Sequence, residues 1–191
     1  MTVFDTDEHP NRASTPEKLA KLRPAFTKDG TVTAGNASGI NDGASFTIIA
    51  SEDAVKKHNL TPLAEVIGIG QGGVDLRVMG LGPTPAILHA LKYADLCIED
   101  MELVELNEAF AAQSLGVIHE LEEATGMDRN AFMEKTNVNG GAIALGHPVG
   151  ASGNRILVSL LHEMQKRDLK IGLASLCIGG GQGAAVIIKR V

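Results

Sequence analysis

The sequence predicts a layered α/β fold in which helices flank a mixed sheet. Short apolar runs of strand length alternate with amphipathic segments of helical period, and the last two runs follow each other directly. Alternation of this kind is typical of parallel strands, while two adjacent runs add an antiparallel pair. The 191 residues are 44% hydrophobic and include 22 glycines, which predicts a sizeable core with close backbone approaches.

The first 60 residues are predicted to contain two helices and one strand. Ser14 and Glu17 match the capping-box pattern at the start of a short helix, which Pro24 should end. A segment of small residues then leads into an apolar run of strand length at 44–50, and residues 51–57 suit a helix.

The remaining residues are predicted to form four strands and three longer helices. The predicted strands of the whole chain cover residues 44–50, 64–69, 102–106, 171–178 and 184–189, and glycine-rich residues 179–183 join the last two. One helix should have Thr84 as its cap and Pro85 in its first turn, and should end near Tyr93. A second begins at Glu108, and a third covers residues 151–166 with an apolar stripe on its buried side.

Charge, cysteine content and hydropathy exclude several classes of protein. The net charge of −6 disfavours general nucleic-acid binding. Cys97 and Cys177 cannot form a disulfide framework, and no CxxC spacing with partnered histidines suggests zinc. There is no signal-peptide pattern or apolar run of membrane-spanning length, so we expect a soluble cytoplasmic protein without a metal.

One stretch is basic despite the acidic whole. Between residues 12 and 28 a single carboxylate, Glu17, stands among Arg12, Lys18, Lys21, Arg23 and Lys28. The stretch is equally well interpreted as a solvated helix face or as a patch that binds an anionic ligand.

Residues 142–153, AIALGHPVGASG, contain a candidate for acid–base chemistry. Gly146 and Pro148 hold the imidazole of His147 on a rigid loop just before a predicted helix start. The positive end of a helix dipole opposes protonation, so the imidazole should be neutral. A neutral imidazole can accept a proton from a thiol and donate a hydrogen bond to an oxyanion. A structural histidine in a turn is the alternative.

Cys177 lies at the end of a predicted buried strand and is followed by three glycines. Their N–H groups could approach a reacting carbonyl without obstruction, which suits nucleophilic or acid–base sulfur. A small buried hydrophobe is the alternative, and it is our interpretation of Cys97, which has no glycines or base nearby.

Asn107 lies at a predicted junction between strand and helix. Its amide could position water or a carbonyl oxygen there, although by itself it would be interpreted as a helix cap.

Residues 68–73, GIGQGG, match the GxGxxG pattern of dinucleotide-binding proteins. That motif requires a helix at its third glycine, whereas residues 74–83 contain two more glycines and a proline. The context therefore argues against a dinucleotide site.

Four segments, taken together, resemble the thiolase family, and most closely its acetyl-CoA C-acetyltransferases. They are NASGINDGA from Asn36, ELNEAFAAQ from Glu105, NVNGGAIALGHPVGASG from Asn137 and SLCIGGGQGAA from Ser175. Thiolases consist of two similar halves, and the resemblance implies the C-terminal half only, with a mixed five-stranded sheet in the layered thiolase fold. Residues 1–61 would then be the end of the loop region with the last strand and helix of the N-terminal domain, and residues 62–191 the C-terminal domain.

The resemblance also implies roles for individual residues. His147 would activate the acylated cysteine and help bind the thioester oxygen, and Asn107 would hold a water at the same place. Cys177 would be the acid–base that moves the α-proton of the second acetyl-CoA, while the Gly179 N–H would face the acyl oxygen. The pantetheine and its channel would be contacted by Ser38, Gly39, Leu22, Phe26, Met79 and Phe110, and the basic stretch would meet the CoA phosphates.

The sequence departs from the family in one respect, because the cysteine that is acylated in thiolases has no counterpart before Cys97. The resemblance therefore implies a partner, an N-terminal half that carries this cysteine, and a homo-oligomer when complete. Coenzyme A thioesters would be substrates, with no further cofactor. The alternatives are a non-catalytic CoA-binding or assembly module derived from a thiolase, and a ketosynthase relative that uses a carrier protein.

Overall fold

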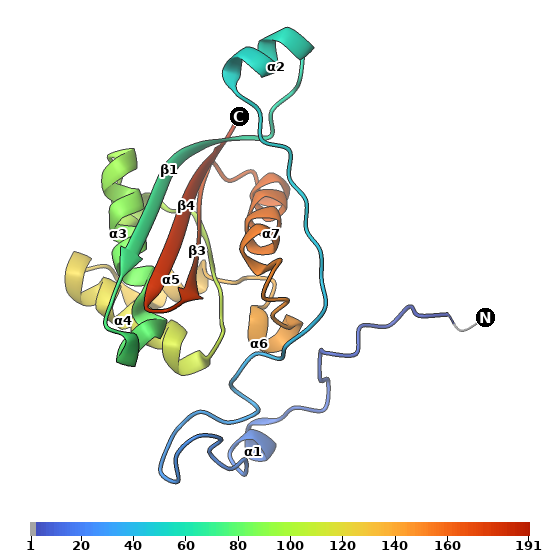
Figure 1. Ribbon diagram of the computed structural model, residues 1–191, viewed down its shortest axis with the longest axis vertical. Coiled ribbons are helices and arrows are strands. Elements are labelled where there is room, and N and C mark those ends of the chain that lie inside the picture. The colour runs from blue at the N-terminus through green and yellow to red at the C-terminus, as the bar shows by residue number, and fades with distance from the viewer. Residues whose placement is uncertain (1–2) are drawn as a thin grey trace.

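The computed structural model describes residues 3–191, so Met1 and Thr2 of the first predicted unit lie outside it (Figure 1). Its centre is a sheet of strand order β1-β4-β3-β2, formed by β1 (Ala64–Gly73), β2 (Leu103–Leu106), β3 (Ile171–Gly179) and β4 (Gln182–Arg190). The β2–β3 pair is parallel and the other two pairs are antiparallel. The predicted mixed sheet flanked by helices is confirmed.

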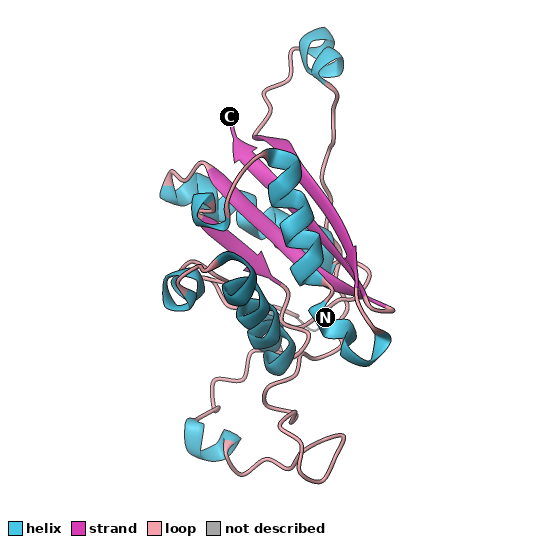
Figure 2. Ribbon diagram, turned by 90° about the vertical axis from the view of Figure 1, so that its left-hand side faces the viewer, coloured by secondary structure: helices cyan, strands magenta, loops and turns pink. Residues whose placement is uncertain are grey.

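Helices cover both faces of this sheet (Figures 1 and 2). α3 (Pro83–Ala94) and α4 (Ala111–Thr125) lie on one face, and α7 (Ser152–Arg167) lies on the other. Successive strand residues point to opposite faces, so Leu173 joins the α3/α4 core while its neighbour Ala174 joins the α7 core. β2 and β3 therefore have buried side chains on both faces, whereas Val66 and Ile69 of the edge strand β1 are 47% and 57% exposed.

The shorter elements connect these layers. They are α1 (Pro16–Leu19), α2 (Glu52–His58), the 3₁₀ helices η1 (Leu76–Leu81) and η2 (Ile98–Asp100), α5 (Arg129–Glu134) and α6 (Ala142–Leu145). None of the helices within residues 3–191 combines the length and the apolar composition that a bilayer-spanning helix requires.

The glycines of the GIGQGG segment lie inside β1 and form no phosphate-binding loop. An added Cβ at Gly70 would lie 1.9 Å from the carbonyl oxygen of Ala86, and one at Gly68 would lie 2.9 Å from that of Ala90. Both carbonyls belong to α3, so the glycines allow this helix to pack directly on the strand. β1 also extends four residues beyond the predicted end at residue 69.

Several predicted helix starts were wrong by one to three residues. Thr15, not Ser14, caps α1, because Pro16 has the fixed φ of a first helical residue and leaves the preceding position as the cap. Gly82, not Thr84, precedes the first residue of α3. α4 begins at Ala111 rather than at Glu108, since Phe110 is still extended.

The sheet has four strands within the described residues, not the five that we predicted. Residues 44–50 run as extended chain without a backbone ladder, and the side chains of Phe46, Ile48 and Ile49 are 90%, 95% and 88% exposed. An apolar run becomes a strand only beside another strand, and none pairs with it within residues 3–191. Two side-chain hydrogen bonds, Thr47–Asn154 and Asn154–Ser45, hold it against α7.

Candidate active site

Asn107 and Cys177 lie at the same edge of the sheet because β2 and β3 are parallel neighbours. Leu106 is the register partner of Ser175, and the N–H of Asn107 donates to the carbonyl of Ser175 at 3.0 Å. The side chain of Asn107 is 2% exposed, and its amide nitrogen and oxygen both lack a hydrogen-bond partner in the described structure. A buried amide without partners is costly, so this one is suited to hold a water or a carbonyl oxygen.

The thiol of Cys177 is half-buried near the end of β3. Its Sγ donates to the backbone carbonyl of Met79, in η1, at 3.2 Å. Gly179 ends the strand with a φ of 91°, and Gly180 and Gly181 continue the turn with φ values of 62° and 75°. Glycine is required here because these positive φ values strain any residue with a Cβ.

His147 follows α6 on a loop that Gly146 opens with a φ of 90°. The His147 N–H donates to the carbonyl of Gly39 at 2.9 Å, and its ring Nδ1 lies 2.6 Å from the hydroxyl of Ser152. Burial lowers the pKa of the imidazole, and the nearby charge of Arg155 lowers it further. The pKa of His147 is therefore lowered, as the sequence predicts. The causes are burial and the charge of Arg155, not the helix dipole that the sequence analysis invoked.

Ser38 and Gly39 connect the His147 loop to the region that follows β2. The Ser38 N–H donates to the carbonyl of Ala109 at 3.0 Å, and the carbonyl of the next residue, Gly39, accepts from His147. The structure therefore joins the NASG segment, the start of α4 and the histidine loop, three segments far apart in the sequence.

The predicted channel residues are divided among three places. Phe26 and Phe110 pack edge to face with ring centroids 6.2 Å apart. Met79 lies beside Cys177 through its backbone carbonyl. Leu22 packs near Gly35, where an added Cβ would lie 2.6 Å from its methyl group. Their contacts with CoA stay predictions.

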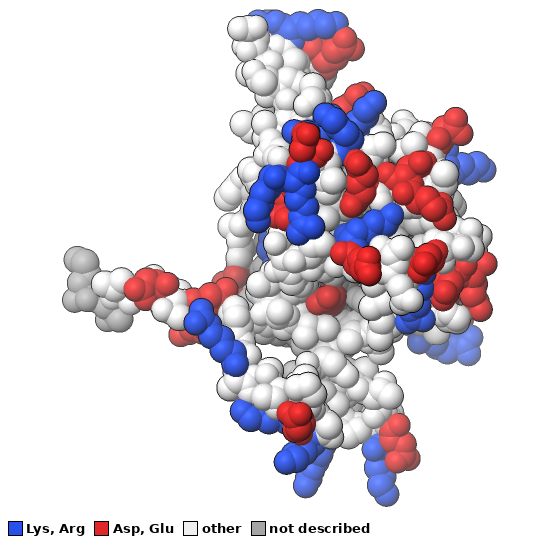
Figure 3. Space-filling view, turned by 180° about the vertical axis from the view of Figure 1, so that it is seen from behind, with Lys and Arg blue, Asp and Glu red and all other residues white. Residues whose placement is uncertain are grey.

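All five cations of the basic stretch are exposed. Figure 3 shows Lys and Arg side chains projecting from the end of the molecule that carries α1. Arg12, Lys18, Lys21, Arg23 and Lys28 are all exposed, and the Nζ of Lys18 donates to the carbonyl of Ala13 at 2.7 Å. These cations are available to phosphate groups, which they would attract in water by charge alone.

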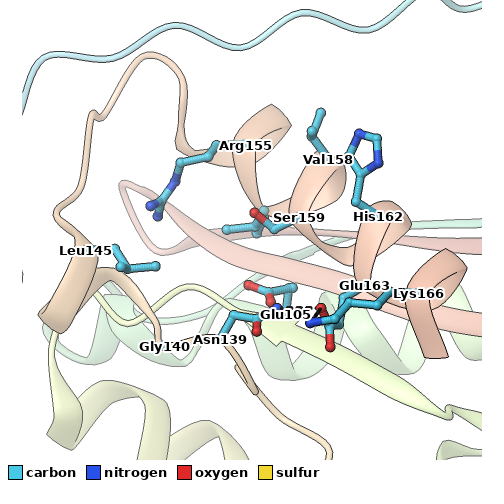
Figure 4. A pocket seen from close by; sticks show the side chains of 11 residues that line it. Glu105, Asn139, Gly140, Leu145, Arg155, Val158, Ser159, His162, Glu163 and Lys166 are labelled. Atoms are coloured by element: carbon cyan, nitrogen blue, oxygen red, sulfur yellow. Dashed lines mark hydrogen bonds and ion pairs between the residues drawn. The ribbon is translucent and has the colours of Figure 1, made fainter. Parts of the chain in front are cut away.

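Sequence reasoning missed a cavity beside α7 that is lined in part by charged side chains. This cavity of about 350 Å³ lies between the 139–145 segment and α7 (Figure 4). Its charged groups come from Glu105, Arg155, Glu163 and Lys166. Burial raises the pKa of Glu105 to about 7, a rise that Arg155 opposes and that Glu108 and Glu163 increase. A hydrogen bond from Asn139, followed by one from Arg167, lowers the pKa of Glu163. Glu105 is the one charged residue in the otherwise apolar strand LVEL, and this signal in the sequence could have located the cavity.

Comparison with known proteins identifies the class to which this fold and these groups belong. The family description "Thiolase, C-terminal domain" matches residues 60–190, and "Thiolase, N-terminal domain" matches residues 1–53. The acetyl-CoA acetyltransferase of Syntrophomonas wolfei is 59% identical over 189 residues, which are 99% of this chain and 46% of the relative. The mitochondrial 3-ketoacyl-CoA thiolase of Homo sapiens is 58% identical over 187 residues, or 98% of this chain and 45% of the relative.

Solved structures agree with these sequence matches. The acetyl-CoA acetyltransferase of Bacillus anthracis has a TM-score of 0.87 at 50% identity, covering 100% of this chain and 46% of that one. The human mitochondrial 3-ketoacyl-CoA thiolase in complex with CoA has a TM-score of 0.85 at 52% identity, covering 98% and 46%. Fold and matches together define a class of layered α/β protein. The chain belongs to the thiolase family, and it spans about half the length of the curated relatives it matches.

Proposed function

We propose that this chain is the C-terminal part of an acetyl-CoA C-acetyltransferase, which condenses two acetyl-CoA to acetoacetyl-CoA or runs the reverse reaction. The observation that carries the proposal is the placement of Asn107 and Cys177 at one sheet edge, joined through the NASG segment to the loop of His147. An N-terminal part would supply the acylated cysteine. As the resemblance implies, the complete enzyme would be a cytoplasmic homo-oligomer.

In the first step the cysteine of the N-terminal part would attack acetyl-CoA. His147 would take the thiol proton as the sulfur–carbon bond forms, and would return it to the departing CoA sulfur. The lowered pKa of His147 supports this role, because a base must be neutral at the working pH. A water held by the unpartnered amide of Asn107 would stabilise the developing oxyanion.

In the second step Cys177 would act as the base. Its sulfur, as the thiolate, would take the α-proton of the second acetyl-CoA, and the carbanion would attack the acyl-cysteine. The bond to the acylated cysteine then breaks, its sulfur leaves as a thiolate, and acetoacetyl-CoA forms. The N–H of Gly179 would face the acyl oxygen at the turn that follows the strand.

The other cysteine of the chain, Cys97, is exposed, so our interpretation of it as a small buried hydrophobe was wrong. It is nevertheless poorly suited to be the acylated nucleophile. The Sγ of Cys97 donates to the carboxylate of Asp100 at 3.1 Å, and this hydrogen bond together with the charge of Asp100 raises the pKa of the thiol. A raised pKa disfavours the thiolate, which is the reactive form. This supports the proposal that the nucleophile belongs to another polypeptide segment.

The exposed run at 44–50 also supports a missing half. Phe46, Ile48 and Ile49 are exposed apolar side chains in an extended segment of smaller residues. The backbone N–H and C=O groups of this segment form no ladder within residues 3–191, so they are available to another strand. Such a segment is stabilised when a sheet accepts it as a strand.

The test is reconstitution with an N-terminal thiolase part, taken from the Syntrophomonas wolfei relative because it is 59% identical over the matched region. The two polypeptides are produced together, purified as a complex, and assayed for CoA-dependent cleavage of acetoacetyl-CoA. We expect activity from the complex and none from either part. His147→Ala should lower kcat by about 10²- to 10⁴-fold, the usual contribution of a general base.

Cys177→Ala should abolish turnover, whereas Cys97→Ser is the matched control and should leave it intact. An assembled complex without activity, or activity that survives His147→Ala, would count against the proposal.

A further inference from the structure

We propose that Ser152 is the positioning residue that fixes which nitrogen of His147 carries the proton. The inference rests on the proposed function only in taking His147 as the base. It concerns a different residue and a property, the tautomer of the ring, that can be measured without turnover.

The contact itself is short and buried. Nδ1 of His147 lies 2.6 Å from Oγ of Ser152, the first residue of α7, and Ser152 is 0% exposed. The serine hydroxyl is closed to solvent, so the direction of this hydrogen bond decides the state of the ring. A neutral imidazole has one N–H and one lone pair, and whichever nitrogen faces the serine determines what the other can do.

The hydroxyl of Ser152 has one proton and a second partner. Its Oγ donates to the carbonyl oxygen of Pro148 at 3.1 Å. With that proton used, Oγ can only accept from the ring, so Nδ1 carries the hydrogen and Nε2 keeps its lone pair. Nε2 is then the basic nitrogen that can take a proton from a thiol.

The backbone fixes the serine relative to the ring. The Pro148 carbonyl that accepts from Oγ also accepts the N–H groups of Ala151 and Ser152, each at 2.8 Å. The carbonyl oxygen of Pro148 therefore connects the residue after His147 to the start of α7. Pro148 is buried and the N–H of His147 is bonded to Gly39, so the backbone on both sides of the ring is held in place. Turning the imidazole would break its bond to Ser152.

The same contact would serve the protonated state. When Nε2 takes a proton, the ring becomes a cation whose Nδ1–H still donates to Oγ, so no group has to reorient during the transfer. The opposite tautomer would present an Nε2–H, which could donate to an oxyanion but could not accept the proton of a thiol.

The test is nitrogen-15 NMR of the chain with labelled histidine, at a pH well above the His147 pKa. The ring signals of His147 are assigned by their loss in His147→Gln. We expect the Nδ1–H tautomer in the native chain and a shift toward Nε2–H in Ser152→Ala. A native ring in the Nε2–H form would overturn the inference, and this readout requires only that the assignment variant His147→Gln folds, not that Ser152→Ala does. An unchanged tautomer in Ser152→Ala would overturn it as well.

Activity of the reconstituted complex gives a second readout. Ser152→Ala should lower kcat by roughly tenfold or more with a smaller change in KM. The reason is that part of the His147 rings would carry the proton on Nε2 and could not act as the base, while substrate binding is kept. Ser159→Ala is the control, an exposed serine of the same helix, and should change neither. Full activity after His147→Ala would refute the proposed function and leave the tautomer result standing, whereas an unaltered kcat in Ser152→Ala would refute the inference alone.

Discussion

Burial lowers the pKa of the His147 imidazole, and the positive charge of Arg155 lowers it further. Both effects disfavour the protonated ring, so the base stays neutral down to a lower pH than an ordinary histidine would. Arg155 itself has a buried Nε without a hydrogen-bond partner in the described structure. The charge of Arg155 therefore has an effect on the pKa of His147 that can be measured.

Arg155→Gln should move the acidic limb of the kcat/KM profile to higher pH. Removing the cation takes away one of the two causes that lower the pKa of His147, so the ring protonates more readily and activity is lost earlier as the pH falls. The shift should be partial, because burial is the larger cause. The measurement is the pH profile of the reconstituted complex, with Lys166→Gln as an exposed control on the same helix. An acidic limb that does not move would contradict the assignment.

The sequence could single out candidate residues where glycines surround a reactive group. His147 and Cys177 stood out because glycine or proline neighbours fix the backbone around them. Ser152 could not be recognised, because its contact with the imidazole depends on how the Pro148 loop folds back onto α7. The cause of the His147 pKa was missed for the same reason, since Arg155 is eight residues away in sequence.

At the scale of elements, the contact between β1 and α3 depends on the absence of side chains. An added Cβ at Gly70 would lie 1.9 Å from one backbone atom of α3 and 2.5 Å from another. Backbone cannot yield as a flexible side chain does, so the helix would have to move away from the sheet.

Gly70→Ala should therefore destabilise the chain by about 2 kcal/mol or more, as overpacking against a rigid neighbour does. Gly73→Ala in the same strand is the matched control, because its nearest atom would be 4.0 Å away. The measurement is the free energy of unfolding in denaturant. Equal stability of the two variants would mean that α3 does not press on β1 at Gly70.

β2 contains a buried carboxyl, Glu105, whose pKa is raised from 4.5 to about 7. The folded state binds this proton more tightly than the unfolded state does. Its contribution to stability is therefore present below pH 4.5 and is lost as the pH rises through 7. A pKa difference of this size corresponds to about 3 kcal/mol.

Glu105→Gln should remove this loss, so the variant should gain stability relative to the native chain between about pH 4.5 and 7. Glu163→Gln should have the opposite sign, because the pKa of Glu163 is lowered and its contribution is present above 4.5. Urea unfolding at a series of pH values measures both. Parallel pH profiles for Glu105→Gln and the native chain would contradict the prediction.

Elements were predictable to within a few residues where caps and periodicity agreed. The helix starts failed at Ser14, Thr84 and Glu108 because the capping pattern does not reveal which of several neighbouring residues first takes helical angles. The end of β1 was missed because its glycines suggested a turn, whereas they are needed for helix packing.

At the scale of the whole molecule, the largest difference concerns residues 44–50. Their composition predicts a strand, and the described structure leaves them extended and exposed. The fold class could be predicted because it depends on patterns within each element. The number of strands could not, because pairing depends on which other segments are present.

The isolated chain should self-associate through this segment. Three large apolar side chains exposed side by side, next to free backbone groups, favour pairing between copies. Replacing Phe46 and Ile48 by serine should shift the chain toward monomer in analytical ultracentrifugation. It should also weaken assembly with the N-terminal part. Tyr93→Ser, an exposed aromatic on α3, is the control and should alter neither. Unchanged sedimentation of the double variant would contradict the prediction.

The strand order has a consequence for synthesis. β1 is bonded only to β4, so more than a hundred residues must follow it before its partner exists. In a polypeptide emerging from the ribosome α3 and α4 can form early. The sheet cannot be completed until the hairpin of β3 and β4 has left the exit tunnel. If synthesis stopped before residue 182, β1 would have no strand to pair with. The incomplete chain would be a substrate for chaperones and proteases.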